Sequence, residues 1–74
     1  MATNSTVITL SDGRSVLLSY GVPVAAFIPG TGYVRTATKY SVTTSRHASE
    51  FAGYASPLVD AAAFATMVAP IATR

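Results

Sequence analysis

The first half of the chain alternates short apolar runs with turn residues, as in a small antiparallel sheet. Runs rich in β-branched residues predict about four strands, at residues 6–10, 15–20, 24–28 and 33–36. An Asp-Gly pair at residues 12–13 predicts a hairpin with a type I′ turn, in which both central residues have positive φ. We therefore expect an antiparallel meander over residues 6–41, and its short connections argue against parallel pairing.

Helical patterning follows the meander. Hydroxyl residues, then helix-compatible residues and Gly53, predict a helix over residues 42–53 with Thr43 or Thr44 as the N-cap. Side chains that fall near three- or four-residue spacing predict the core-facing stripe, which is Val42, His47, Phe51 and Tyr54.

A second helix is predicted over residues 56–69, with Ser56 as the cap, Pro57 at the first position and Pro70 after the end. This helix is apolar nearly all round, so it should be buried, either within the protomer or at an oligomer interface. The alternative is that the tail is a poorly specified extension. The complete pattern predicts an α+β fold in a single domain over residues 1–74.

The composition favours a partner. Hydrophobic residues make up 50% of the chain and charged residues only 11%, whereas soluble domains are roughly 25% charged. A lone small domain with so few charges exposes apolar surface, so we expect a homo-oligomer; the alternative is a monomer coated with serine and threonine. Because there is no cysteine, disulfides and thiolate metal sites are excluded.

The charge balance disfavours nucleic-acid binding but is compatible with the binding of a small anion. Five Lys and Arg residues give a net charge of +2, whereas contacting roughly 6–10 phosphates of a duplex needs more cations than one chain supplies. The apolar stretch at residues 57–72 is interrupted and shorter than the roughly 20 residues that span a bilayer. We expect no membrane contact and, since residues 1–5 do not resemble a signal peptide, a cytoplasmic protein.

The chain contains few residues of the types that usually act in catalysis. The chain has one histidine and three acidic residues. A Ser-His-Asp triad can be written from Ser45, His47 and Asp60, but nothing in the sequence brings them together. His47 and Glu50 share a predicted helix face, yet two ligands are too few for a metal. We expect no enzymatic activity, no metal and no cofactor.

The best candidate site lies at the start of the first helix. A helix N-terminus offers free N–H groups and a positive dipole to an anion, and cations expected in its first turn oppose that dipole unless an anion binds. The predicted ligand-binding residues are Lys39, Tyr40, Thr43, Thr44, Ser45, Arg46 and His47. Tyr40 is the expected stacking partner for a base. The alternative is a plain helix cap, with Arg46 paired to Glu50.

Two stretches resemble a signature of small proteins of unknown function that bacteriophages and prophages encode. The first reads Ser-Tyr-Gly-x-Pro-Val-Ala at residues 19–25, and the second reads Tyr-Ser-x-Thr-Thr-Ser-Arg-His at residues 40–47. The resemblance covers roughly residues 15–53 and not the alanine-rich tail. It implies a phage origin, and small phage proteins commonly act on host systems, for instance by sequestering nucleotide signals of host immunity.

We therefore expect a non-enzymatic, homo-oligomeric binder of a small phosphorylated, nucleotide-like ligand in the host cytoplasm. Two other functions stay open. The chain is either a protein-interaction module that docks on a host or phage protein, or a weak nucleic-acid binder. A concave basic pocket would favour the small ligand, whereas positive charge spread over several faces would favour DNA.

Overall fold

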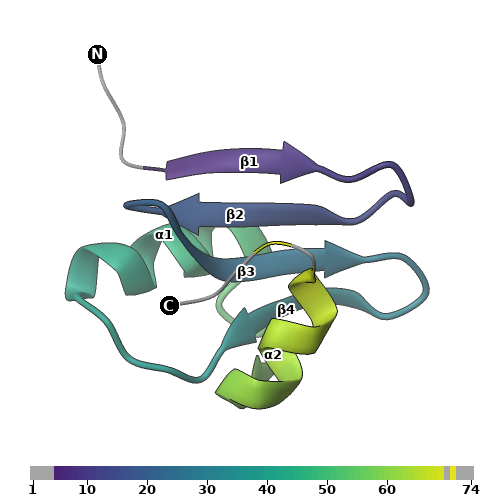
Figure 1. The fold of residues 1–74 in the computed structure, drawn as a ribbon. Coiled ribbons are helices and arrows are strands. Elements are labelled where there is room, and N and C mark those ends of the chain that lie inside the picture. Colours follow the sequence, from purple (N-terminus) through teal and green to yellow (C-terminus); the bar gives the residue numbers. More distant parts are fainter. Residues whose placement is uncertain (1–4, 70, 72–74) are drawn as a thin grey trace.

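A five-stranded sheet lies between two helices in the computed structural model, which describes residues 5–69 and residue 71 (Figure 1). The elements in chain order are β1 (Ser5–Thr9), β2 (Ser15–Ser19), β3 (Val22–Ile28), β4 (Gly32–Thr36), α1 (Val42–Ala52), β5 (Leu58–Val59) and α2 (Ala61–Val68). Strands β1 to β4 form an antiparallel meander, which confirms the predicted α+β fold.

The turn between β1 and β2 differs from the predicted type I′ turn. Leu10 donates to the Arg14 carbonyl at 2.7 Å, Gly13 donates to the Leu10 carbonyl at 3.0 Å, and of the two central residues only Gly13 has positive φ, at 95°. This is the pattern of a three-residue loop that ends in a glycine bulge. The Asp12 carboxylate accepts from the Arg14 amide at 3.1 Å, a local bond that competes with the type I′ geometry.

A hairpin with positive φ at both central residues occurs one connection later. Ser19 pairs with Val22, and the two residues between them, Tyr20 and Gly21, have φ of 53° and 78°. This combination is characteristic of a type I′ turn. Tyr20 is the one non-glycine residue with positive φ in the described part of the chain, so the turn places an aromatic ring at a backbone position that is costly for a side chain.

The fifth strand was not predicted, and it corrects the expectation that no parallel pairing occurs. β5 runs parallel to β4, with Arg35 opposite Leu58 and Thr36 opposite Val59. The crossover is α1, which returns the chain to the same edge of the sheet. Residues 56–59 are therefore not helical. The second helix begins at Ala61 with Asp60 as its N-cap, so both the cap and the first helical residue lie four positions later than predicted.

The first helix spans nearly the predicted residues, but its cap was predicted wrongly and its buried face only in part correctly, since Phe51 packs against the core as expected. Ser41 is the N-cap, and its side chain accepts from the Thr44 amide. The glycine stop at Gly53 is confirmed. Val42 and Tyr54 are 79% and 74% exposed, so they do not face the core. The helix instead buries small residues against the sheet: Thr44, Ala48 and Ser49.

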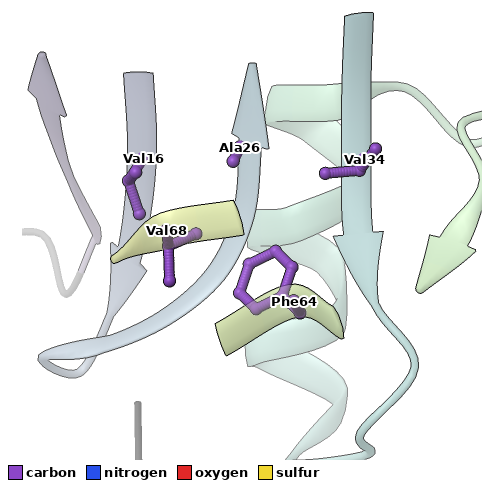
Figure 2. Close-up of a cluster of buried hydrophobic side chains, with 5 residues drawn as sticks. All are labelled: Val16, Ala26, Val34, Phe64 and Val68. Carbon is purple, nitrogen blue, oxygen red and sulfur yellow. The ribbon is translucent and has the colours of Figure 1, made fainter. Parts of the chain in front are cut away.

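Each helix covers one face of the sheet with its own apolar cluster. Phe64 and Val68 of α2 pack on β2, β3 and β4 (Figure 2), where the strand residues are Val16, Ala26 and Val34. On the other face, Ala48 of α1 packs on Leu17, Val24 and Ala25. The apolar side of α2 is thus buried within the protomer.

Neither helix of the described chain is long and apolar enough to cross a membrane.

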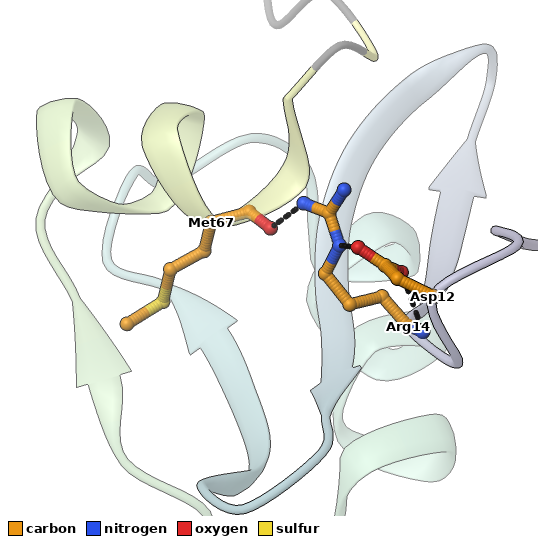
Figure 3. Close-up of polar contacts among 3 residues, drawn as sticks. All are labelled: Asp12, Arg14 and Met67. Atoms are coloured by element: carbon orange, nitrogen blue, oxygen red, sulfur yellow. Dashed lines mark hydrogen bonds and ion pairs between the residues drawn. The ribbon is translucent and has the colours of Figure 1, made fainter.

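An arginine of the first hairpin holds the end of α2 (Figure 3). Arg14 Nη1 donates to the Met67 carbonyl at 2.8 Å, and its Nε lies 2.7 Å from the Asp12 carboxylate. The last carbonyls of a helix have no partner within the helix, so a cation there satisfies one of them and opposes the negative end of the dipole. These contacts fasten the short helix to the sheet.

Candidate functional site

A pocket of about 180 Å³ lies between α1, the β4–α1 connection and β5. Its lining residues come from β3, β4, α1, β5 and the connection: Val24, Arg35, Thr36, Ala37, Thr38, Lys39, Tyr40, Thr44, Ser45, Ala48, Ser49 and Leu58. The unpredicted strand β5 thus supplies one wall. The buried side chains Val24, Thr44, Ala48 and Ser49 form the floor, and exposed residues that include Lys39, Tyr40 and Ser45 form the rim.

The charged side chains that line the pocket are all positive. Arg35 and Lys39 are among the lining residues, and no aspartate or glutamate is. In the described chain, the one ion pair is that of Arg14 with Asp12, so neither pocket cation has a carboxylate partner. The pocket is therefore electropositive as well as concave, which is the arrangement that was expected to favour a small anion over a nucleic acid.

Arg35 is held rigidly by neutral acceptors. Its Nε donates to Ser56 Oγ at 2.8 Å, and its Nη1 donates to Ser49 Oγ at 3.2 Å. Its Nη2 donates to the carbonyls of Tyr54 at 3.1 Å and Ser56 at 2.7 Å. These bonds engage four of the five N–H donors of a guanidinium and leave its charge without a direct counter-ion among the described residues.

The pocket gathers only part of the predicted site. Lys39, Tyr40, Thr44 and Ser45 line it, whereas Thr43, Arg46 and His47 do not. Because α1 begins at Val42, Arg46 and His47 lie in the second turn and not, as predicted, in the first; the helix dipole acts mainly on the first turn. Arg46 is exposed, and it forms no ion pair with Glu50.

His47 belongs to a second polar cluster on the other side of Thr44. Its Nδ1 lies 2.9 Å from Ser19 Oγ, and its ring stacks on Tyr20 with centroids 6.2 Å apart. Ser19 also donates to Thr44 Oγ1 at 3.2 Å, and Ser41 donates to the same oxygen at 3.2 Å. The two stretches that resemble the phage signature therefore meet in space through these side chains.

The triad written from the sequence does not form. Asp60 Oδ1 accepts from the Ala63 amide at 2.8 Å as the cap of α2, and Ser45 lies at the pocket, away from the His47–Ser19 contact. Ser19 itself is 1% exposed, so its hydroxyl is closed to a substrate. Within residues 5–69 and residue 71, no three metal-ligating side chains come together.

Arg35 is a pocket residue that the sequence did not reveal. In the sequence it stands in a strand, with no neighbouring signal of a binding site. The available hint was its charge, because an arginine in a short and largely apolar strand must find acceptors if it is partly buried. The acceptors come from residues 14–21 positions further along the chain, which no local pattern reveals.

Comparison with known proteins gives a family and no further relatives. No curated protein and no solved structure matches the chain. A family model matches residues 1–62. Of the described residues, this range contains the five strands, α1 and all those that line the pocket, but little of α2. The chain belongs to this family, which is described as a family of unknown function (DUF8033).

Proposed function

We propose that the protein is a non-enzymatic binder of a small phosphorylated, nucleotide-like ligand, and that the phosphate end occupies the pocket beside α1. The observation that carries this proposal is the charge of the lining, with Arg35 and Lys39 present and no carboxylate. A hydrogen bond to a charged group contributes roughly 1.5–3 kcal/mol, so an anion between these side chains would gain from each of them.

The state of Arg35 supports an anion in particular. Its guanidinium is fixed by four neutral acceptors, so the charge is pre-positioned and a ligand need not order it on binding. One N–H donor is left over for a ligand. Ser45 and Lys39 at the rim add a hydroxyl and a mobile ammonium, and the start of α1 adds a dipole of the same sign.

The size of the pocket limits how the ligand is held. About 180 Å³ is below the roughly 300–1,000 Å³ of pockets that enclose drug-sized molecules. A whole nucleotide would therefore insert its phosphate and leave its base at the rim. Tyr40 stands at the rim with 40% of its surface exposed, which suits stacking against a base.

Binding without turnover agrees with the lining. No histidine, aspartate or glutamate lines the pocket, so the usual general bases are not placed beside a bound phosphate. Together with the resemblance to phage proteins, this supports sequestration as the role, in which a host immune nucleotide is held in the cytoplasm and not consumed. No cofactor is needed for that role.

The test is calorimetric titration of the protein with inorganic phosphate, AMP and ATP. Lys39→Gln and Arg46→Gln form a matched pair, because each removes one exposed cation but only Lys39 lines the pocket. We expect Lys39→Gln to weaken binding about three- to fivefold, as for an exposed charged contact, and Arg46→Gln to change it less than about twofold. Absence of binding by all three compounds, or equal losses in both variants, would refute the pocket as a phosphate site.

A further inference from the structure

The two edges of the sheet are protected to different degrees. β5 forms one edge, contains two residues and directly follows Pro57. β1 forms the other edge (Figure 1) and is five residues long, and β2 is its one neighbouring strand among the described elements. Short strands, prolines, charges and bulges are the usual means by which proteins block an edge. β1 has none of them: its sequence is Ser-Thr-Val-Ile-Thr, and its register with β2 is continuous.

The outward-facing groups of β1 follow from the hydrogen bond at its end. Leu10 donates to Arg14, so Leu10 faces β2, and in an antiparallel pair the residues that face the partner alternate with those that face away. The N–H and C=O groups of Val7 and Thr9 therefore point to the open edge. The Val7 side chain is also 50% exposed, although valine is usually among the buried residues.

We propose that the β1 edge is a homodimer interface, in which two copies of this chain pair their β1 strands antiparallel about a two-fold axis at Val7. This register is self-complementary. It places Val7 opposite Val7 and Thr6 opposite Ile8, so β-branched side chains meet one another and no charge faces a charge. A two-fold interface requires such a self-complementary patch, and strand addition at an open edge is a common mode of association.

The second copy fits this edge better than a groove-bound ligand or a charged partner. The strand carries no charge that would select an oppositely charged protein. A five-residue strand buries less than the roughly 1,200–2,000 Å² of a standard interface, so the dimer should be weak and dependent on concentration. β1 and β5 are opposite edges of one sheet, so this proposal does not rest on the phosphate pocket.

Single-cysteine variants test the register directly, because the chain has no cysteine of its own. In the proposed pairing the two Val7 Cα atoms are about 5.5 Å apart, within disulfide range. Two Thr9 residues are offset by four positions, or about 13 Å. Under mild oxidation, Val7→Cys should form a cross-linked dimer on a non-reducing gel, and Thr9→Cys should stay largely uncross-linked. Equal cross-linking at both positions, or none at Val7, would overturn the proposed register.

Charge variants test the interface without a covalent bond. Val7→Lys and Val7→Glu each place like charges opposite one another, so each protein alone should sediment as a 7.6 kDa monomer across the micromolar range. Mixed together, they should form a heterodimer that native mass spectrometry resolves. Leu58→Lys, at the other edge and 61% exposed, is the control, and this variant should dimerise as the wild type does. A monomeric wild type, or a dimer that survives Val7→Lys, would refute the proposal.

Discussion

Replacing Arg35 with methionine would remove the side chain that ties β4 to the segment between α1 and β5. Methionine keeps an apolar stem of similar length but loses all four donated bonds. Ser49 is 7% exposed, so its hydroxyl would lose a partner that water does not easily replace. The Tyr54 carbonyl belongs to an exposed contact and would regain water.

The magnitude follows from that division. A bond to a charged group is worth roughly 1.5–3 kcal/mol net, and bonds whose acceptors return to water count for less, so we expect a loss of about 2–4 kcal/mol. A chain of 74 residues has a total stability of about 4–11 kcal/mol at 0.05–0.15 kcal/mol per residue. The loss should lower the Tm by about 8–30 °C, since each kcal/mol corresponds to about 4–8 °C in a domain of this size.

Urea unfolding followed by far-ultraviolet circular dichroism measures the change. Arg35→Lys should lose nearly as much, because an ammonium cannot reproduce the planar set of donors. Lys39→Met removes the same charge from the same pocket, with none of the four Arg35 bonds at stake, and should stay within about 0.5 kcal/mol of wild type. A change below about 0.5 kcal/mol in Arg35→Met would show that these contacts do not fasten β5, and the reasoning would be wrong.

Three further predictions test the cap, the core and the acidic turn. Ser41→Ala should cost about 1 kcal/mol of unfolding free energy as the loss of an N-cap, whereas Thr43→Ala should change the Tm little. Phe64→Ala should cost about 3–5 kcal/mol and expose the sheet face to a hydrophobic dye. The backbone N–H and side chain of Arg14 lower the pKa of Asp12. The ionised Asp12 carboxylate therefore stabilises the folded protein fully above the ordinary aspartate pKa. This stabilisation is lost as the pH falls through the lowered pKa of Asp12 in the folded protein. The difference in Tm between wild type and Asp12→Asn should shrink correspondingly in acid.

The meander could be predicted because its signals are local. β-Branched runs favour strands, and glycines mark the positions of the connections, as at Gly21 and Gly30. The end of α1 at Gly53 was readable for the same reason. The exact turn types were not, because the Asp-Gly pair at residues 12–13 is compatible with two hairpin geometries. The hydrogen bond that the Arg14 amide donates to the Asp12 carboxylate favours the longer loop.

β5 could not be predicted because two residues carry no periodicity. Ser56 and Pro57 match the start of a helix by composition, yet both carbonyls are used elsewhere: the Ser56 carbonyl accepts from the Arg35 side chain and the Pro57 carbonyl from the Arg35 amide. A tertiary contact thus overrides the local preference, and Asp60 provides the cap four residues later.

The candidate site was half predictable for a related reason. The hydroxyl cluster and Lys39 pointed to the region of the pocket, but the cap is Ser41, two or three residues before the predicted cap, so the residues expected in the first turn lie further along the helix. His47 then faces Ser19 and not the pocket, and Arg46 points to solvent. A rotation of about 100° per residue decides which side chains share a face, so an error of one residue in a helix start changes the composition of a site.

Thr44 explains why so few of the hydroxyls remain for a ligand. It lies on the pocket floor and is only 6% exposed, and its Oγ1 accepts from Ser41 and Ser19. In the described chain no buried side-chain nitrogen or oxygen lacks a partner, so the floor is already satisfied and rigid. The floor therefore shapes the pocket, but its polar side chains are already hydrogen-bonded and offer few donors to a ligand. Under the proposed function, recognition of a phosphate would therefore come from the remaining Arg35 N–H, Lys39 and Ser45. The hydroxyls of Ser41 and Thr44 are instead bonded to each other and to Ser19, and these bonds join α1 to the end of β2.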